Sequence, residues 1–224
     1  MQRTKLIDRS LPNYTRGEEL ANFISHTVGG AFGVIALLLC PIIAAYHQNI
    51  RGITSGIIFG ISLIALYAIS SVYHALPPKL YGKRVMQVLD HCTIFALIAG
   101  SYTPFALVTL YEHSPQLGVQ IMLFVWGAAI LGIILNAIDL KRYRTFSIVC
   151  YLIMGWCIVF KAPLLVTLLG STGFSLLLGG GILYTIGAIL YVIGLKKHYS
   201  HSVFHVFTVL GSLCHIICIA FFVM

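Results

Sequence analysis

The sequence has very few charged residues. Only 9% of its 224 residues are Asp, Glu, Lys or Arg, and just six of these are acidic. Soluble domains carry about a quarter of their residues as charged side chains. With 59% hydrophobic residues, the chain has more apolar surface than one soluble core can bury. This composition excludes an ordinary soluble domain and indicates an integral membrane protein.

Two further features are missing from the sequence. No two cysteines have the C-x-x-C spacing of redox or metal motifs, and the first 19 residues contain no apolar stretch of the kind that forms a secretory signal. We therefore expect no leader peptide. All the cysteines lie in apolar runs, and we interpret them as small buried residues. They are Cys40, Cys92, Cys150, Cys157, Cys214 and Cys218.

Apolar runs of about 20 residues, long enough for a helix to cross a bilayer, recur along the chain. We count seven, at residues 22–46, 53–74, 85–109, 117–138, 146–168, 174–195 and 201–223. The connections between them are short and contain turn-forming residues. The sequence therefore predicts an all-α fold, a seven-transmembrane helix bundle. A polar N-terminal tail at residues 1–18 precedes one membrane domain at residues 19–224.

Positive charge is distributed unevenly among the connections. All but two of the 14 Lys and Arg residues fall in the tail and in the second, fourth and sixth connections: Arg3, Lys5, Arg9, Arg16, Lys79, Lys83, Arg84, Lys141, Arg142, Arg144, Lys196 and Lys197. Because basic loops stay in the cytoplasm, we predict a cytoplasmic N-terminus and, with seven spans, a C-terminus outside. Topology and contact with anionic lipid then explain the net charge of +8, and we expect no nucleic-acid binding.

Polar residues within the predicted spans collect at one depth. Four spans place them near their predicted cytoplasmic ends: Glu19, Asn22, His26, His74, Asp90, His201 and His205. Ionisable side chains are costly in lipid and usually mark a functional site. We therefore expect a site in this layer.

The segment HSVFH contains two histidines, His201 and His205, four residues apart. On a helix they share one face, about 6 Å apart along the axis, so both imidazoles can bind one ion. His74, predicted at the same depth, would be a third ligand. Three neutral histidines leave the fourth position of Zn²⁺ open for water. The alternative is that the H-x-x-x-H spacing is a coincidence.

Two further residues are candidate catalytic groups. Ser70 lies one turn before His74 on the same face, where it could hydrogen-bond a substrate carbonyl or the water on the metal. Alternatively, it bonds the carbonyl four residues earlier in its own helix. Asp90 could accept a proton from that water or orient a ligand histidine. Alternatively, it pairs with Lys83 or Arg84.

The residues Glu19, Asn22 and His26 form one stripe, with i, i+3, i+7 spacing. We predict that they brace the site; the alternatives are a fourth metal ligand or a cap at the start of the first helix. His215 lies about 15 Å along its helix from His205 and is not expected to bind the same ion. His91 is interpreted as structural.

Together these residues form a motif set. E-x-x-N-x-x-x-H (Glu19, Asn22, His26), S-x-x-x-H (Ser70, His74), LD followed by IAGSYTPF (Asp90, Gly100–Phe105) and H-x-x-x-H (His201, His205) occur in this order. The chain resembles the bacterial hemolysin III family of the progestin and adiponectin receptor superfamily over all seven spans. The resemblance implies a seven-helix fold with an inside N-terminus. It also implies zinc held by His74, His201 and His205, with Asp90 and Ser70 beside it.

The resemblance also suggests functions. Relatives among the receptors are thought to hydrolyse lipid amides such as ceramides, and bacterial members are linked to lysis of red cells and to control of membrane fluidity. We expect a zinc-dependent hydrolase of lipid amide or ester bonds, located in the bacterial plasma (inner) membrane and linked to lipid homeostasis. Its partners would be membrane lipids. The alternatives are a non-enzymatic fluidity sensor with structural zinc and a cytolytic pore-forming protein.

Overall fold

A computed structural model describes residues 4–194 and 197–224, and these residues form helices and connecting turns without any strand. Two of the basic residues that support the topology prediction, Arg3 and Lys196, lie outside the described residues. The all-α fold class predicted from the sequence is confirmed for the part of the chain that the structure describes.

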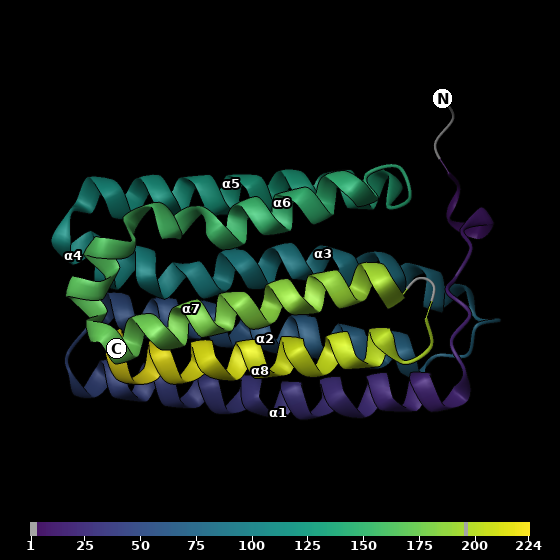
Figure 1. Ribbon diagram of the computed structural model, residues 1–224, viewed down its shortest axis with the longest axis horizontal. Helices are drawn as coiled ribbons and strands as arrows, with labels where there is room; N and C mark the ends of the chain where they lie inside the picture. The colour runs from purple at the N-terminus through teal and green to yellow at the C-terminus, as the bar shows by residue number, and fades with distance from the viewer. Residues whose placement is uncertain (1–3, 195–196) are drawn as a thin grey trace.

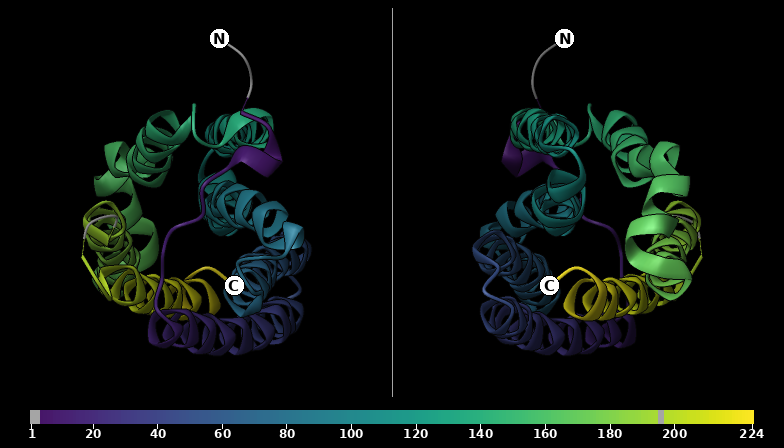
Figure 2. Two further views of the ribbon diagram at one scale, coloured as in Figure 1. Left: turned by 90° about the vertical axis from the view of Figure 1, so that its right-hand side faces the viewer. Right: turned by 90° about the vertical axis from the view of Figure 1, so that its left-hand side faces the viewer.

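Long helices run along the longest axis of the molecule, joined by short connections (Figure 1). The elements are η1 (Leu6–Asp8), α1 (Arg16–Tyr46), α2 (Ile50–Ala75), α3 (Tyr81–Pro104), the π-helix η2 (Phe105–Leu110), α4 (Tyr111–His113), α5 (Pro115–Asp139), α6 (Arg144–Trp156), η3 (Cys157–Lys161), α7 (Ala162–Gly194) and α8 (Ser200–Phe222). The most extensive helix contacts join α1 to α2, α7 to α8, and α2 to α3. Viewed end-on, the helices stand in a ring, and the N-terminal segment crosses one end of it (Figure 2).

Within the part of the chain that the structure describes, six helical stretches are long and apolar enough to cross a membrane. One of them, Arg144–Gly194, has 51 residues and comprises α6, η3 and α7, which turn back on themselves in Figure 1. The stretch containing α3 is the most buried, whereas large apolar side chains elsewhere, such as Leu123 and Phe160, are exposed. Exposed apolar surface of this extent is expected of a helix bundle that faces lipid.

The predicted continuous span at residues 146–168 is wrong in its second half. Helix α6 ends at Trp156, and a tighter 3₁₀ turn follows before α7. Residues 169–173, the connection predicted between the spans at 146–168 and 174–195, contain Gly170, whose φ of 68° divides α7 into two helical parts. That left-handed conformation suits glycine, which has no Cβ to clash. Hydrophobicity does not indicate the 3₁₀ turn after Trp156, because the residues on both sides of this turn are apolar.

Close helix contacts depend on small residues. The buried Gly60 in α2 packs against α1, and a Cβ placed on it would lie 2.5 Å from the backbone Cα of Leu37. Membrane helices associate through such small-residue contacts because lipid provides no hydrophobic driving force between them.

We expect Gly60→Ala to destabilise the bundle by about 1–3 kcal/mol, the usual effect of overpacking a tight contact. Gly127→Ala is the matched control, because a Cβ at that helical position has no neighbour within 4 Å among the described residues. Thermal unfolding in detergent measures both variants. Equal melting temperatures for the two would show that the α1–α2 contact is looser than described.

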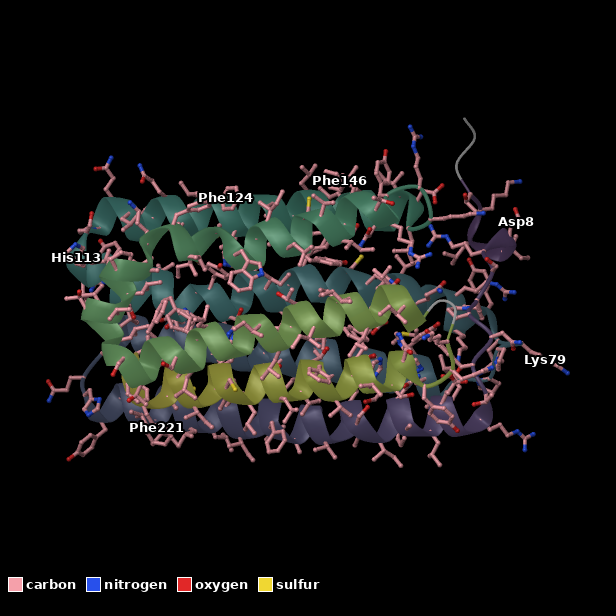
Figure 3. All side chains as sticks on the ribbon, viewed as in Figure 1. Asp8, Lys79, His113, Phe124, Phe146 and Phe221 are labelled. Carbon is pink, nitrogen blue, oxygen red and sulfur yellow. The ribbon has the colours of Figure 1, made fainter. Side chains whose placement is uncertain are left out.

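The two ends of the bundle differ in charge. Lys79 and Asp8 lie at one end and His113 at the other (Figure 3). The N-terminal tail and the connections that follow α2, α5 and α7 share the first end, as the alternating helix directions require. These segments carry the Lys and Arg residues on which the topology prediction rests. We call the end of the bundle at which they lie the basic end.

Candidate metal centre

The site at the basic end is positioned by the first turns of α1 and α8. Thr15 and Glu18 form a reciprocal capping box at the beginning of α1, which satisfies backbone N–H groups that the helix leaves free. Glu18 also accepts a hydrogen bond of 2.8 Å from the backbone N–H of Tyr199, just before α8. One carboxylate therefore holds the first turns of both helices at the same depth. The cap is made by Thr15 and Glu18, rather than by Glu19 or Asn22.

Three histidines meet at this depth. His74 comes from the last turn of α2, and His201 and His205 come from the first two turns of α8. Each offers one ring nitrogen, and these atoms all lie within 4.8 Å of one another. His201 Nε2 and His205 Nε2 are 3.0 Å apart. All three side chains are buried. We call them the histidine cluster.

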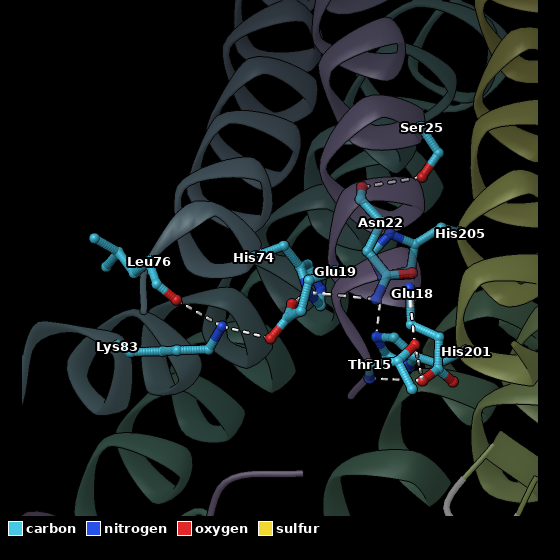
Figure 4. A network of polar contacts seen from close by, with 10 residues as sticks. All are labelled: Thr15, Glu18, Glu19, Asn22, Ser25, His74, Leu76, Lys83, His201 and His205. Carbon is cyan, nitrogen blue, oxygen red and sulfur yellow. Dashed lines mark hydrogen bonds and ion pairs between the residues drawn. The ribbon is translucent and has the colours of Figure 1, made fainter. Parts of the chain in front are cut away.

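A charged network holds His74 in place (Figure 4). Glu19 Oε2 lies 2.6 Å from His74 Nδ1, and the other oxygen of Glu19 accepts a 2.6 Å hydrogen bond from Lys83. Lys83 is 2% exposed and also donates to the carbonyl of Leu76. Asn22 Nδ2 lies 3.4 Å from His74 Nδ1. Glu19 thus joins α1, α2 and α3 beside His74.

The third residue of the predicted stripe, His26, packs on the cluster through its ring. Its ring is stacked on that of His205 with 3.6 Å between centroids. Tyr67 contacts the other side of His26 edge-on at 5.1 Å. His26 is not among the described residues that could share one ion with the cluster. His26 therefore packs against one face of the His205 ring.

The donor set fits a zinc ion. Within residues 4–194 and 197–224, His74 Nε2 and His205 Nδ1 are buried and have no hydrogen-bond partner. A buried polar atom left without a partner is costly unless something binds it. The carboxylate of Glu19 on His74 Nδ1 is the usual outer partner of a metal-binding histidine, since it fixes the tautomer that presents Nε2 to the metal. Three imidazoles make the donor set of a zinc site with one open position.

Ser70 and Asp90 line one cavity together with His201 and His205. The volume of this cavity is about 170 Å³. Ser70 Oγ is buried and makes no hydrogen bond to any described residue, so the alternative in which it bonds its own helix does not hold. Asp90 Oδ2 lies 3.8 Å from His91 Nδ1. Both candidate catalytic groups therefore face the space beside the cluster.

The remaining histidines of the prediction are not among the described residues that could share an ion with the cluster. His91 Nδ1 lies 2.9 Å from the carbonyl oxygen of Gln87. His91 Nε2 lies 3.2 Å from the hydroxyl of Tyr191, a packing role that agrees with the structural interpretation. His215 contacts the carbonyl of Leu177 and does not belong to the group that could share an ion.

Two residues at the site were not predicted from the sequence. The sequence indicates Lys83 only as a partner of Asp90, yet its ammonium group binds Glu19. Tyr14 precedes α1, and its ring is stacked on His201 with a centroid distance of 4.9 Å and tilted against His74 at 5.8 Å. Burial raises the pKa of the Tyr14 phenol well above its ordinary value, so the hydroxyl stays protonated. The spacing of apolar residues does not indicate that Lys83 or Tyr14 reaches the site, because each lies in a polar segment.

Tyr14 covers the cluster from the basic end, and its removal should open that side. For protein loaded with zinc in vitro, we expect Tyr14→Ala to increase the rate at which a chelator removes the ion by about twofold to tenfold, the factor that corresponds to one stacked aromatic pair. Tyr81→Ala is the control, since Tyr81 is 55% exposed at the start of α3. An unchanged rate in Tyr14→Ala would contradict a covering role for Tyr14.

Comparisons with known proteins agree with the motif set. A family model described as "Haemolysin-III related" matches residues 14–216. Hemolysin-3 of Bacillus cereus is 38% identical over 208 residues, which cover 92% of each chain. The Hemolysin-3 homolog of Bacillus subtilis (strain 168) is 37% identical over 93% of this chain and 96% of its own. The human monocyte to macrophage differentiation factor is 28% identical over 70% of this chain and 66% of its own.

Proposed function

Since the chain belongs to the haemolysin-III related family, we propose that this multi-pass membrane protein binds Zn²⁺ through His74, His201 and His205 and hydrolyses an amide or ester bond of a membrane lipid. The observation that carries the proposal is the buried His74, which has a carboxylate on one ring nitrogen and no described partner on the other. A buried imidazole arranged in this way is suited to hold a metal ion.

The side chains around the cavity have complementary roles in the proposed reaction. A bound zinc ion would polarise the scissile carbonyl and lower the pKa of water toward 7. Asp90 accepts a proton from the attacking water and then returns it to the leaving group. Ser70 donates a hydrogen bond to the carbonyl oxygen of the substrate. Glu19 and Lys83 keep His74 in one orientation, and His26 fixes the ring of His205 by stacking.

The proposal includes an orientation in the membrane. The stretch formed by α6 and η3 crosses it once and α7 crosses it again, which gives seven passes. The basic end faces the cytoplasm because Lys- and Arg-rich loops are retained there. The C-terminus then lies outside. The membrane is the bacterial plasma membrane, and the substrate is one of its own lipids, which links the activity to lipid homeostasis. The acyl part of that lipid occupies the cavity, whose lining is mostly apolar.

A second function is favoured by the network at the site. Glu19 joins α1 to both α2 and α3, and His201 and His205 add α8. A metal ion held here would connect helices from both ends of the sequence, as a structural element of a sensor of bilayer packing requires. In that case Asp90 has no chemical role.

Metal analysis and turnover together test the proposal. We expect purified wild-type protein to contain zinc and to release fatty acid from at least one member of a panel of ceramides and acyl lipids. Protein without zinc would contradict both functions. Protein with zinc but without any turnover across the panel would favour the sensor.

A further inference from the structure

The cavity beside the histidine cluster contains a second polar position, a ring nitrogen of His215, away from the cluster. Among the described residues that line it, five hold a buried polar atom without a hydrogen-bond partner: His26, Ser70, Arg144, His205 and His215. The first four belong to the basic end, where Arg144 stands 5.7 Å from the ring of Tyr191 and Tyr191 contacts His201. His215 is alone, farther along α8. One unsatisfied atom therefore stands deep in the bundle, away from the proposed chemistry.

The hydrogen bond made by Nε2 of His215 determines what its other ring nitrogen, Nδ1, can bind. His215 is 8% exposed, and its Nε2 lies 3.2 Å from the carbonyl oxygen of Leu177. A carbonyl only accepts, so Nε2 carries the proton and Nδ1 of the neutral ring is an acceptor. The ring edge rests on Gly180, where there is no room for a Cβ. Nδ1 is thus a fixed acceptor that requires a donor.

Nearby hydroxyl groups are already engaged. Tyr184 and Ser212 share a 2.7 Å hydrogen bond. Thr185 donates to a backbone carbonyl at 2.8 Å, and so does Tyr102. The protons of these hydroxyls go to other acceptors, and none of these groups donates to Nδ1 of His215. The donor is therefore better supplied by a ligand that the apolar walls also hold.

The spacing of the two polar points matches a lipid tail. Ten residues separate His205 from His215 on one helix, which corresponds to about 15 Å, half of the ~30 Å hydrocarbon thickness of a bilayer. Apolar side chains line the space between them, including Leu66, Ile94, Leu97, Ile98, Ile148 and Leu152. His215 also lines a second cavity of about 40 Å³ that is largely apolar. A tail can therefore continue past His215.

We propose that the cavity binds a long acyl chain with a hydroxyl group near its middle, and that this hydroxyl donates a hydrogen bond to Nδ1 of His215. The placement of the carbonyl end at the histidine cluster rests on the proposed function. The hydroxyl subsite itself rests only on the cavity and on His215.

Equilibrium binding of fatty acids tests the subsite. Stearic acid and hydroxystearic acid with its hydroxyl on the twelfth carbon displace a fluorescent fatty acid from the purified wild-type protein. We expect the hydroxylated acid to bind about twofold to tenfold more tightly, as one net hydrogen bond provides. A hydroxyl on the second carbon should give no such gain, since it lies far from His215. Because no bond is hydrolysed in this assay, a protein that lacks turnover can still give the expected result.

Two substitutions test whether Nδ1 of His215 is the atom that accepts the hydrogen bond from the hydroxyl. His215→Gln keeps a donor for the carbonyl of Leu177 and removes the Nδ1 acceptor, so the preference should disappear while the affinity for stearic acid stays the same. His215→Asn places an acceptor where Nδ1 was and should retain the preference. Equal binding of both acids by the wild type, or an unchanged preference in His215→Gln, would overturn the proposal. Loss of the preference in both variants would overturn the assignment to Nδ1.

Discussion

Purified His205→Ala protein is expected to contain almost no zinc, whereas the wild type is expected to bind about one ion per chain. The substitution removes one of three imidazoles whose ring nitrogens lie within 4.8 Å of one another. Loss of an outer-sphere partner alone weakens metal binding by about 10- to 100-fold, and a direct ligand contributes at least as much. Zinc per chain is measured by elemental analysis after purification in a metal-buffered solution.

His215→Gln is the matched control for this experiment. It replaces another buried histidine on the same helix, one that is not part of the histidine cluster, and it should leave the zinc content unchanged. His201→Gln gives a second test if His205→Ala is poorly folded, because glutamine preserves more of the side-chain volume. A full complement of zinc in either cluster variant would mean that the ion binds elsewhere.

Asp90→Asn is expected to retain zinc and to lose hydrolysis by a factor of about 10²–10⁴, the usual contribution of a general acid–base group. Asparagine has nearly the same shape as aspartate, so the cavity and the histidine cluster stay in place, but the amide accepts no proton at neutral pH. Asp90 is not one of the residues that could share the ion. Zinc content and the rate of fatty-acid release are measured on the same preparation.

The control for Asp90 is Glu112→Gln, which removes a carboxylate from the exposed connection at the opposite end of the bundle. Its turnover should equal that of the wild type. If Asp90→Asn hydrolysed lipid at the wild-type rate, Asp90 would have no part in proton transfer. If neither the wild type nor any variant hydrolysed lipid while zinc remained bound, the function of a structural metal in a membrane sensor would be favoured.

Much of the helical framework could be predicted from hydrophobicity. The predicted spans at residues 22–46 and 201–223 correspond to α1 and α8, because a lipid environment requires long apolar helices with satisfied backbone groups. The turn after Trp156 could not be predicted. Apolar residues continue through it, and a 3₁₀ turn within an apolar run leaves no sign in composition. The break at Gly170 lies within residues 169–173, where the sequence predicts a connection between two spans.

The histidine cluster could be predicted because helical spacing and predicted depth both restrict where a side chain can lie. Four-residue spacing places His201 and His205 on one face, and the direction of α2 places His74 at the same end. The partners of this layer could not be predicted in the same way. Lys83 and Tyr14 reach it from a helix start and from the tail, so their contacts depend on how these segments cross the end of the bundle.

X-ray absorption spectroscopy at the zinc edge, on the purified wild-type protein, tests the central claim most directly. We predict a spectrum of three imidazole nitrogens and one oxygen at about 2.0–2.1 Å, with the multiple scattering characteristic of histidine rings. A sulfur ligand at about 2.3 Å, fewer than three histidines, or protein that holds no zinc at all would contradict the assignment of the ion to His74, His201 and His205.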